Sequence, residues 1–174
     1  VKDLGCDAYF TSPHKWLLAP AGSGLLYIDK YLAPDVWTTL PSGSWDNHED
    51  EGFRFTERVT DNSAMMVGYE AAVDFHNKIG HKKITDRIKE LGDYFREGLM
   101  SSDIFEIHSS VHPDMCAGLT TYGVKGVSGK DLQTEMWKRE KLQPRPVGPD
   151  QKYIRFSTHF YNSKEEIDRA LDVA

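Results

Sequence analysis

Two consecutive segments with helical periodicity occupy residues 61–100 and constrain the fold more than any other feature of the sequence. The first, DNSAMMVGYEAAVDFHNKIG, begins with residues typical of a helix N-terminus and ends at Gly80. The second runs from about Lys83 to Met100. Its apolar residues form one helical stripe: Ile84, Ile88, Leu91, Tyr94, Phe95 and Leu99. Because a helix with such a stripe must bury it, the second helix is predicted to pack on another layer of structure.

The residues after Met100 alternate between short strand patterns and helical patterns. Strands are predicted at FEIHSS, CAGLTTYGV and KYIRFSTHF, and an edge strand at LQPRPV because its prolines exclude a central position. Helices are predicted at SGKDLQTEMWKRE and at SKEEIDRALDVA, the latter capped by Asn162 or Ser163. This mixture predicts a small α+β layer packed on a sheet, with the joint to the preceding part of the chain near Gly80.

The N-terminal part of the chain is predicted to contain two strands joined by a loop. CDAYFTS favours a short strand, and LLYID is an apolar run of the length of a buried strand. The prolines and glycines of SPHKWLLAPAGSG, between them, indicate a loop that presents His14, Lys15 and Trp16. Residues 40–55 are polar and rich in turn formers, so they indicate a long surface or active-site loop, in which Trp45 is a candidate for substrate selection.

Composition restricts the class of function. The 174 residues include 21 Lys and Arg against 27 Asp and Glu, a net charge of -6, which disfavours nucleic acid as a partner. No run of about 18 apolar residues is present, so no membrane-spanning helix is expected. Two cysteines, Cys6 and Cys116, are too few for a disulfide framework. They are expected to be small buried hydrophobic residues in a cytoplasmic protein. The histidines lack metal-binding spacing, so no metal site is expected.

Both ends of the sequence suggest a piece of a longer protein. The chain begins at Val1 rather than at a methionine, without the pattern of a signal peptide. It stops at Ala174, inside a helical pattern that has no stop residue. We therefore expect further residues beyond this chain.

Lys15 is the residue whose surroundings in the sequence point most clearly to a chemical function. It stands between His14 and Trp16 in a loop that joins two strands, whereas lysines usually lie on solvated faces. A partly desolvated lysine amine is nucleophilic near neutral pH and forms Schiff bases with carbonyl groups. Ser12 and His14 would then offer hydrogen-bond donors to a nearby anionic group such as a phosphate. The alternative is a solvated loop lysine, which composition alone favours.

Two blocks of sequence resemble a known family. DAYFTSPHKWLLAPAGSGLLYI resembles the cofactor-lysine motif of the class V aminotransferases, which are fold-type I pyridoxal-phosphate (PLP) enzymes. Its sequence pattern, HKWLLAP-x-G-x-G-x-LY, is most similar to that of the isopenicillin N epimerase-like branch of the family. Cysteine desulfurases and selenocysteine lyases are other branches. Near the C-terminus, IRFSTHFYN is similar to the family's R-x-S-x-x-x-YN element. The resemblance covers residues 4–173.

The resemblance implies an α/β fold, namely the C-terminal part of a fold-type I PLP-dependent transferase. Residues 1–80 would be the end of the large PLP-binding domain, and residues 81–174 the small α+β domain. Such enzymes are homodimers with active sites at the subunit interface. The family's acidic partner of the pyridine nitrogen, its ring-stacking residue and its main phosphate cradle precede the lysine motif, so they are expected upstream of Val1.

The resemblance also assigns roles to site residues. Lys15 would hold PLP as a Schiff base and move the α-proton of an amino-acid substrate, while Ser12 and His14 bind the phosphate. Arg155 would receive the substrate carboxylate, which a planar guanidinium can hold by two parallel hydrogen bonds. Independently of the resemblance, the predicted strand of Arg155 also contains His159, which makes it a candidate to face the site. The reaction outcome would be transamination, epimerisation or a C–S or β-elimination.

The sequence departs from the family pattern in two places. A Gly-Thr pair, whose threonine binds the phosphate of the neighbouring subunit, is replaced by Arg58-Val59-Thr60. Depending on the register, either Val59 replaces the threonine or Thr60 serves one position late, and Arg58 is an alternative source of charge. Residues 142–150 lack the cysteine of the desulfurases, so a persulfide mechanism is not expected. In that region Arg145 is either a second anion contact or a surface charge.

Three alternatives remain open from the sequence. The protein could be a non-catalytic scaffold or binding protein that keeps the fold, or a Schiff-base lyase that needs no cofactor. The chain on its own could also be inactive. Intact Ser12, His14, Lys15 and Arg155 argue against a scaffold, and the phosphate-type donors argue against a cofactor-free lyase.

Overall fold

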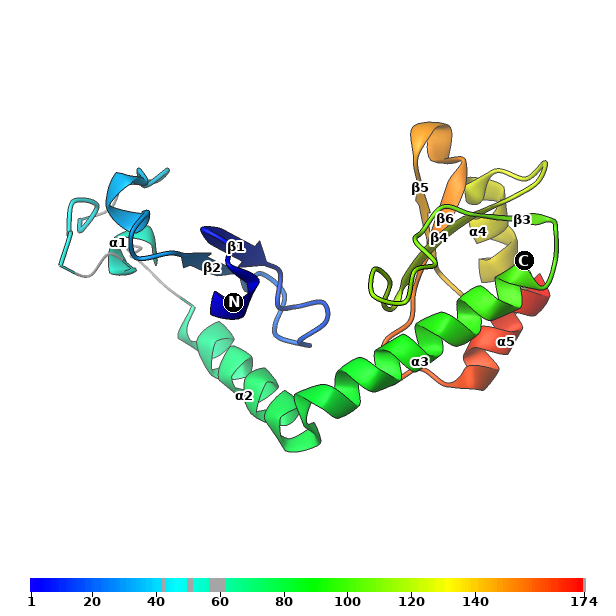
Figure 1. Ribbon diagram of the computed structural model, residues 1–174, viewed down its shortest axis with the longest axis horizontal. Coiled ribbons are helices and arrows are strands. Elements are labelled where there is room, and N and C mark those ends of the chain that lie inside the picture. Colours follow the sequence, from blue (N-terminus) through cyan, green and yellow to red (C-terminus); the bar gives the residue numbers. More distant parts are fainter. Residues whose placement is uncertain (42, 50–51, 57–61, 174) are drawn as a thin grey trace. The chain divides into compact units, whose positions relative to one another are not determined.

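The computed structural model describes residues 1–41, 43–49, 52–56 and 62–173 (Figure 1). The chain divides into two compact units, Val1–Lys78 and Ile79–Ala174. The boundary between the units lies two residues from Gly80, where the sequence pattern placed a joint. Among the described helices, none is long and apolar enough to cross a membrane.

The first unit is built around a β-hairpin and one long helix (Figure 1). Strands β1 (Ala8–Thr11) and β2 (Leu25–Ile28) pair antiparallel, with Ala8 opposite Ile28 and Thr11 opposite Leu25. The long helix α2 (Ser63–Ile79) begins where Asn62 accepts a hydrogen bond from the backbone amide of Met65. The remaining elements are short: the 3-10 helices Lys2–Leu4 and Ala33–Asp35, and helix α1 (Phe53–Thr56). The two strands, the joining loop and the long helix are as the sequence predicts.

Strand β2 is not buried as its apolar run predicts. Leu25 and Leu26 are 37% and 54% exposed, and Tyr27 and Ile28 are half-buried. The hairpin forms a two-stranded sheet without a further strand beside it in the described part of the chain, so the apolar residues lack a covering layer there. The cysteines also differ from the prediction that they are buried, since Cys6 and Cys116 are only partly buried.

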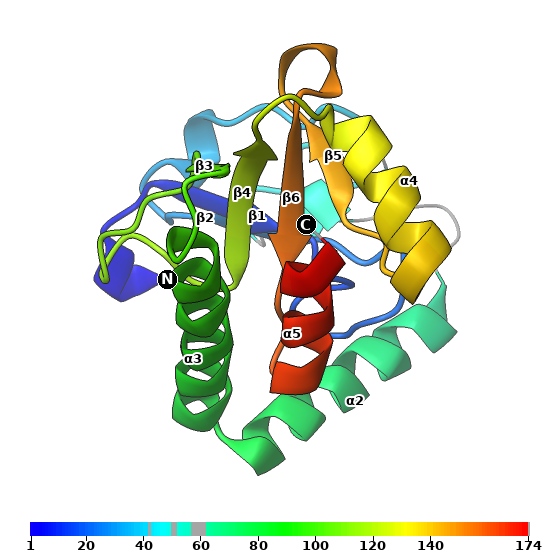
Figure 2. The same ribbon diagram turned by 90° about the vertical axis from the view of Figure 1, so that its right-hand side faces the viewer.

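The second unit is a four-stranded antiparallel sheet with three helices on one side (Figure 2). The strands lie in the order β3-β4-β6-β5, so the proline-containing strand β5 is at an edge, as predicted. The strands are β3 (Phe105–Ile107), β4 (Leu119–Val124), β5 (Arg145–Val147) and β6 (Tyr153–Ser157). The helices are α3 (His81–Met100), α4 (Gly129–Glu140), α5 (Lys164–Val173) and the 3-10 helix Pro149–Gln151.

The core of this unit lies between the sheet and the helices. Its buried residues are Leu91, Phe95 and Leu99 of α3, Tyr122 of β4, Leu132 and Met136 of α4, Ile154 of β6, and Ile167 and Ala170 of α5. The Phe95 ring lies 4.9 Å from Phe156 and 5.7 Å from Tyr122, centroid to centroid. The predicted stripe on α3 therefore faces the sheet, with Ile88 and Tyr94 at its half-buried margin.

Side-chain alternation along the strands leaves the other face of the sheet more open. In β6, Ile154 is buried and Phe156 is packed on the core, while Arg155 between them is exposed. In β4, Thr120 and Tyr122 are buried and Thr121 is half-exposed. Because successive side chains of a strand point to opposite faces, Arg155 and Thr121 lie on the face away from the helices.

Candidate active site

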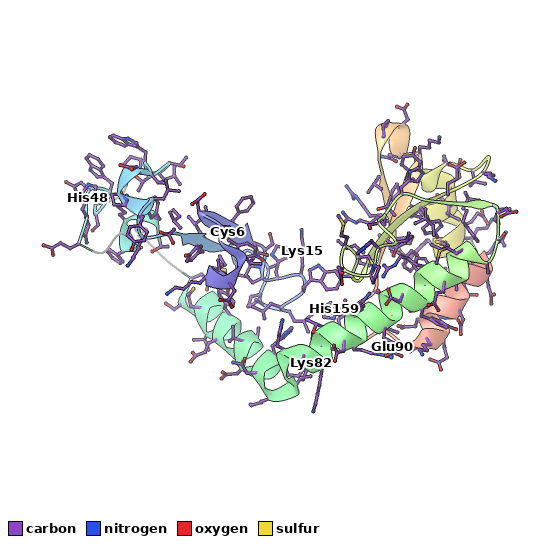
Figure 3. The ribbon with its side chains drawn as sticks, viewed as in Figure 1. Cys6, Lys15, His48, Lys82, Glu90 and His159 are labelled. Atoms are coloured by element: carbon purple, nitrogen blue, oxygen red, sulfur yellow. The ribbon has the colours of Figure 1, made fainter. Side chains whose placement is uncertain are left out.

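Ser12, His14 and Lys15 lie at the start of the loop between β1 and β2. Figure 3 labels Lys15 in this loop. The backbone amide of Lys15 donates to the carbonyl of Ser12 at 3.2 Å, and the amide of Leu18 donates to the carbonyl of Lys15 at 3.3 Å. The amide of Ala19 closes the turn on the carbonyl of Pro13 at 3.2 Å. The hydrogen-bonded backbone therefore holds close together three residues whose side chains carry a hydroxyl, an imidazole and an amine.

These three side chains are exposed, whereas the residues that anchor the loop are buried. Pro13 and Ala19 are buried beneath the turn. Ser23 is also buried, and its hydroxyl donates to the carbonyl of Pro20 at 2.7 Å. Lys15 has no ion-pair partner among the described residues. Its exposure differs from the partial desolvation expected of a Schiff-base lysine, so the described residues alone do not desolvate its amine.

The loop is seated on helix α2 through a glycine that the sequence patterns do not single out. A Cβ atom added at Gly68 would lie 2.5 Å from Cγ of Pro20, so the ring of Pro20 occupies the space that any larger side chain would need. Gly22, on the same loop, also lies near the helix, since an added Cβ would lie in ordinary van der Waals contact with Sδ of Met65 at 3.7 Å. The only signal in the sequence is a glycine within an otherwise regular helical pattern, which often marks close packing.

Arg155 lies in strand β6, on the open face of the sheet. In register it lies opposite Thr121 of β4 on one side and opposite Arg145 of β5 on the other. Both arginines are exposed, and neither has an ion-pair partner within the described ranges. The strand is held in place by Ile154 and Phe156, whose side chains enter the core.

The YN element that follows Arg155 forms the connection from β6 to α5. The side chain of Asn162 accepts a hydrogen bond from the backbone amide of His159 at 2.8 Å and donates one to Glu166 at 2.9 Å. Its backbone carbonyl accepts a hydrogen bond from Arg87 of α3 at 3.2 Å. The hydrogen bond from Asn162, followed by that from the backbone amide of Ser163, holds the pKa of Glu166 below its usual value. Asn162 therefore fixes the turn, while His159 lies nearby.

His159 follows the end of β6 at Ser157, so the prediction that it lies in the strand of Arg155 is wrong, and its side chain is buried. Its ring packs against Phe160 at 4.5 Å and against Tyr161 at 4.3 Å, centroid to centroid. The expectation that it faces a ligand therefore stays a prediction.

Trp45 lies in a second loop region of the first unit. Its ring stacks on Trp37 with centroids 6.0 Å apart and planes inclined by 15°. Both rings line a cavity of about 240 Å³ together with His48 and the buried Arg54. Arg54 donates a hydrogen bond to the carbonyl of Ala33. The predicted turn-rich segment thus has an aromatic wall that a ligand could contact.

The predicted site residues form two groups. Ser12, His14 and Lys15 are together in the first unit, and Arg155 lies in the second unit beside Arg145 and Thr121. Thr60, with Arg58 and Val59, lies outside the described residues. Among the residues described, no group of three or more His, Cys, Asp or Glu side chains is placed to hold a metal ion.

Comparison with known proteins identifies a family and shows its fold. Isopenicillin N epimerase from Amycolatopsis lactamdurans is 31% identical over 187 residues, which cover 97% of this chain and 46% of the relative. The structure of a cysteine desulfurase from Thermococcus onnurineus NA1 superposes with a TM-score of 0.83 at 25% identity, covering 99% of this chain and 47% of that one. A variant of C-DES with glycine covalently linked to its PLP cofactor superposes with a TM-score of 0.81 at 21% identity, covering 98% and 46%.

The chain therefore spans about half the length of the proteins that it matches. The fold predicted from the resemblance, that of the fold-type I PLP-dependent enzymes, is confirmed by these superpositions. The family model for class V aminotransferases matches residues 1–170, nearly the whole chain. The chain belongs to the class V aminotransferase family.

Proposed function

We propose that the protein is a PLP-dependent enzyme that acts on an amino acid through a Schiff base at Lys15. The observation that carries the proposal is the turn on which Ser12, His14 and Lys15 lie together, with the Lys15 amine exposed and without an ion-pair partner in the described chain. Family membership supports PLP as the cofactor, as does the C-DES structure with its PLP-linked glycine.

The side chains of this turn fit a phosphorylated aldehyde. A primary amine attacks an aldehyde to give a carbon–nitrogen double bond, and water leaves. The Ser12 hydroxyl and the His14 imidazole offer donors to the phosphate oxygens, at positions one and three residues from the lysine. When bound, PLP supplies an electron sink that stabilises negative charge at the substrate α-carbon.

The family resemblance implies a role in substrate binding for Arg155 in addition to the role of Lys15. Arg155 pairs with the α-carboxylate through its planar guanidinium, which fixes the orientation of the substrate. The Lys15 amine would take the proton from the α-carbon and deliver it to the atom, or to the face of that carbon, that the reaction requires. His14 and Ser12 keep the phosphate in place, so the reacting atoms keep their alignment.

The fate of the α-proton and of the side chain decides among the reactions. Transamination moves the proton to another atom, epimerisation returns it to the opposite face of the α-carbon, and elimination expels a group from the side chain. Relatives include an epimerase and cysteine desulfurases, so these chemistries occur on one fold. Residues 142–150 hold no cysteine, and this disfavours a persulfide formed on that segment. We also propose that the enzyme works as a homodimer, as the family resemblance implies.

The proposal is tested by the visible absorption of the protein with PLP. The wild-type protein should show the band of a lysine-bound cofactor and turn over an amino acid. Lys15→Ala should lose both, whereas Lys30→Ala, which removes an exposed lysine from the same unit, should keep both. If Lys15→Ala keeps the band and the turnover, the proposal is wrong and a scaffold or another lysine must be considered.

A further inference from the structure

Arg145 and Arg155 lie directly opposite each other on neighbouring antiparallel strands. Residues in such register have Cα atoms about 4.5–5.5 Å apart and side chains on the same face of the sheet. Like charges in this arrangement destabilise a sheet. The two guanidinium groups therefore lower the stability of the sheet, although the fold itself does not require an arginine at either position.

No acidic side chain of the sheet compensates this pair. Glu106 of β3 is opposite Gly123 rather than Thr121, so it stands in a different row, at the far edge of the sheet. Its carboxylate lies 3.9 Å from Nε2 of His108. Within the described ranges, neither Arg145 nor Arg155 has a carboxylate within ion-pair distance.

A further hydrogen-bond donor, the Thr121 hydroxyl, and an aromatic ring, that of Tyr153, lie on the same face of the sheet as the arginine pair. Thr121 continues the row beyond Arg155, and its hydroxyl can donate to an anion. The next row holds Tyr153, whose ring lies 3.9 Å from that of His108, centroid to centroid. Glycines make room for this ring, since an added Cβ would lie 3.2 Å from it at Gly123 and 2.6 Å from it at Gly148. The Tyr153 ring therefore lies in a packed position on the sheet face that also carries Arg155, two residues along the same strand.

We propose that Arg145 and Arg155 form a two-point site for a ligand with two carboxylates, so that the substrate is an amino acid with an acidic side chain. This inference rests on the proposed function, in which Arg155 holds the α-carboxylate. Arg145 holds the second carboxylate. Each guanidinium can bind one carboxylate through two parallel hydrogen bonds. A substrate with a single carboxylate would leave one of two adjacent positive charges uncompensated.

Binding of succinate and butyrate to the purified protein tests this inference. The two probes have the same chain length and differ in the second carboxylate. Because neither carries an amine, their binding requires no Schiff base at Lys15, so failure of this inference is distinguishable from failure of the proposed function. Calorimetry should show succinate binding about tenfold or more tighter than butyrate, the effect of one additional charge-assisted pair.

Two variants show whether Arg145 is responsible. In Arg145→Gln the preference for succinate should fall to about twofold or less, since the second carboxylate loses its charged partner. Lys125→Gln removes an equal charge from an exposed turn, so its preference should match the wild type. Circular dichroism establishes that both variants are folded. Equal affinity of the wild type for the two probes overturns the inference, as does a preference that survives in Arg145→Gln.

Discussion

The side-chain amide of Asn162 donates a hydrogen bond to the carboxylate of Glu166 at 2.9 Å. Glu166 also accepts from the backbone amide of Ser163 at 3.1 Å, while the Ser163 hydroxyl accepts from the amide of Glu166 at 3.2 Å. This reciprocal capping box begins helix α5. The box lies in the connection between the strand of Arg155 and helix α5, and the Glu166 carboxylate accepts two hydrogen bonds there.

Acid should weaken the protein partly through Glu166. The hydrogen bonds from Asn162 and from the backbone of Ser163 lower the pKa of Glu166 in the folded state. A carboxylate with a lowered folded-state pKa stabilises the protein above its unfolded-state pKa of about 4.3, and this stabilisation is lost as the pH falls through the folded-state value. Glu166→Gln keeps a capping side chain but cannot titrate, so its stability should decrease less on acidification.

Urea unfolding at about pH 6 and about pH 3.5, on either side of the unfolded-state pKa, measures this dependence. Glu97→Gln is the control, since Glu97 is an exposed carboxylate of α3 without an ion pair in the described chain. Glu97→Gln should follow the wild type. An equal loss in Glu166→Gln and wild type would mean that Glu166 does not contribute to the acid sensitivity.

Removal of the Tyr122 hydroxyl should leave the protein unchanged in stability or stabilise it. Tyr122 is fully buried between the rings of Phe95 and Phe105, and its hydroxyl has no hydrogen-bond partner among the described residues. Burial also raises the pKa of this hydroxyl. Since an unpaired buried hydroxyl costs about 1–3 kcal/mol, Tyr122→Phe should not reduce the free energy of unfolding. A reduction by more than about 1 kcal/mol would show that the hydroxyl has a partner.

Replacement of Gly68 by alanine should displace the loop that carries Lys15. An alanine normally stabilises a helix interior by about 1 kcal/mol relative to glycine. Here its Cβ would lie 2.5 Å from Cγ of Pro20, so overpacking should reverse the sign and cost about 1–3 kcal/mol. The affinity of the variant for PLP should also fall, because the displaced loop carries Lys15. The control Gly24→Ala lies on the same loop with nothing within 4 Å of the added Cβ, and should keep wild-type affinity. A more stable Gly68→Ala would exclude this packing role.

Arg145→Gln should stabilise the protein when no anion is bound. Relief of like-charge repulsion between directly opposite residues is worth about 0.2–1 kcal/mol. Addition of succinate should stabilise the wild type more than the variant, since a ligand that binds the folded state raises its apparent stability. Thermal melts with and without succinate measure both effects at low salt. A variant that is less stable without anion would indicate that the two arginines do not repel each other.

Much of the fold can be predicted from local sequence patterns. The apolar stripe of α3, the proline-bearing edge strand β5 and the Ser163 cap each depend on neighbouring residues, and each is found in the structure. Exposure of β2 could not be predicted, since an apolar run reports the tendency to be buried and not the presence of a covering layer.

Less of the candidate site than of the fold can be predicted from the sequence. The turn with Lys15 stands out because its residues are adjacent in the chain. The contact of Gly68 with Pro20 and the register of Arg145 with Arg155 join residues 48 and 10 positions apart, so only the folded chain shows them. Register in particular depends on the length of the connection between β5 and β6, which includes the 3-10 helix Pro149–Gln151.

The most direct test of the central claim is the identity of the residue that binds the cofactor. The protein is incubated with PLP, reduced with borohydride so that any Schiff base becomes a stable secondary amine, digested and analysed by mass spectrometry. We expect the phosphopyridoxyl group on Lys15, in the peptide that contains Ser12 and His14. Modification confined to other lysines, or none after reduction, would contradict the assignment of Lys15.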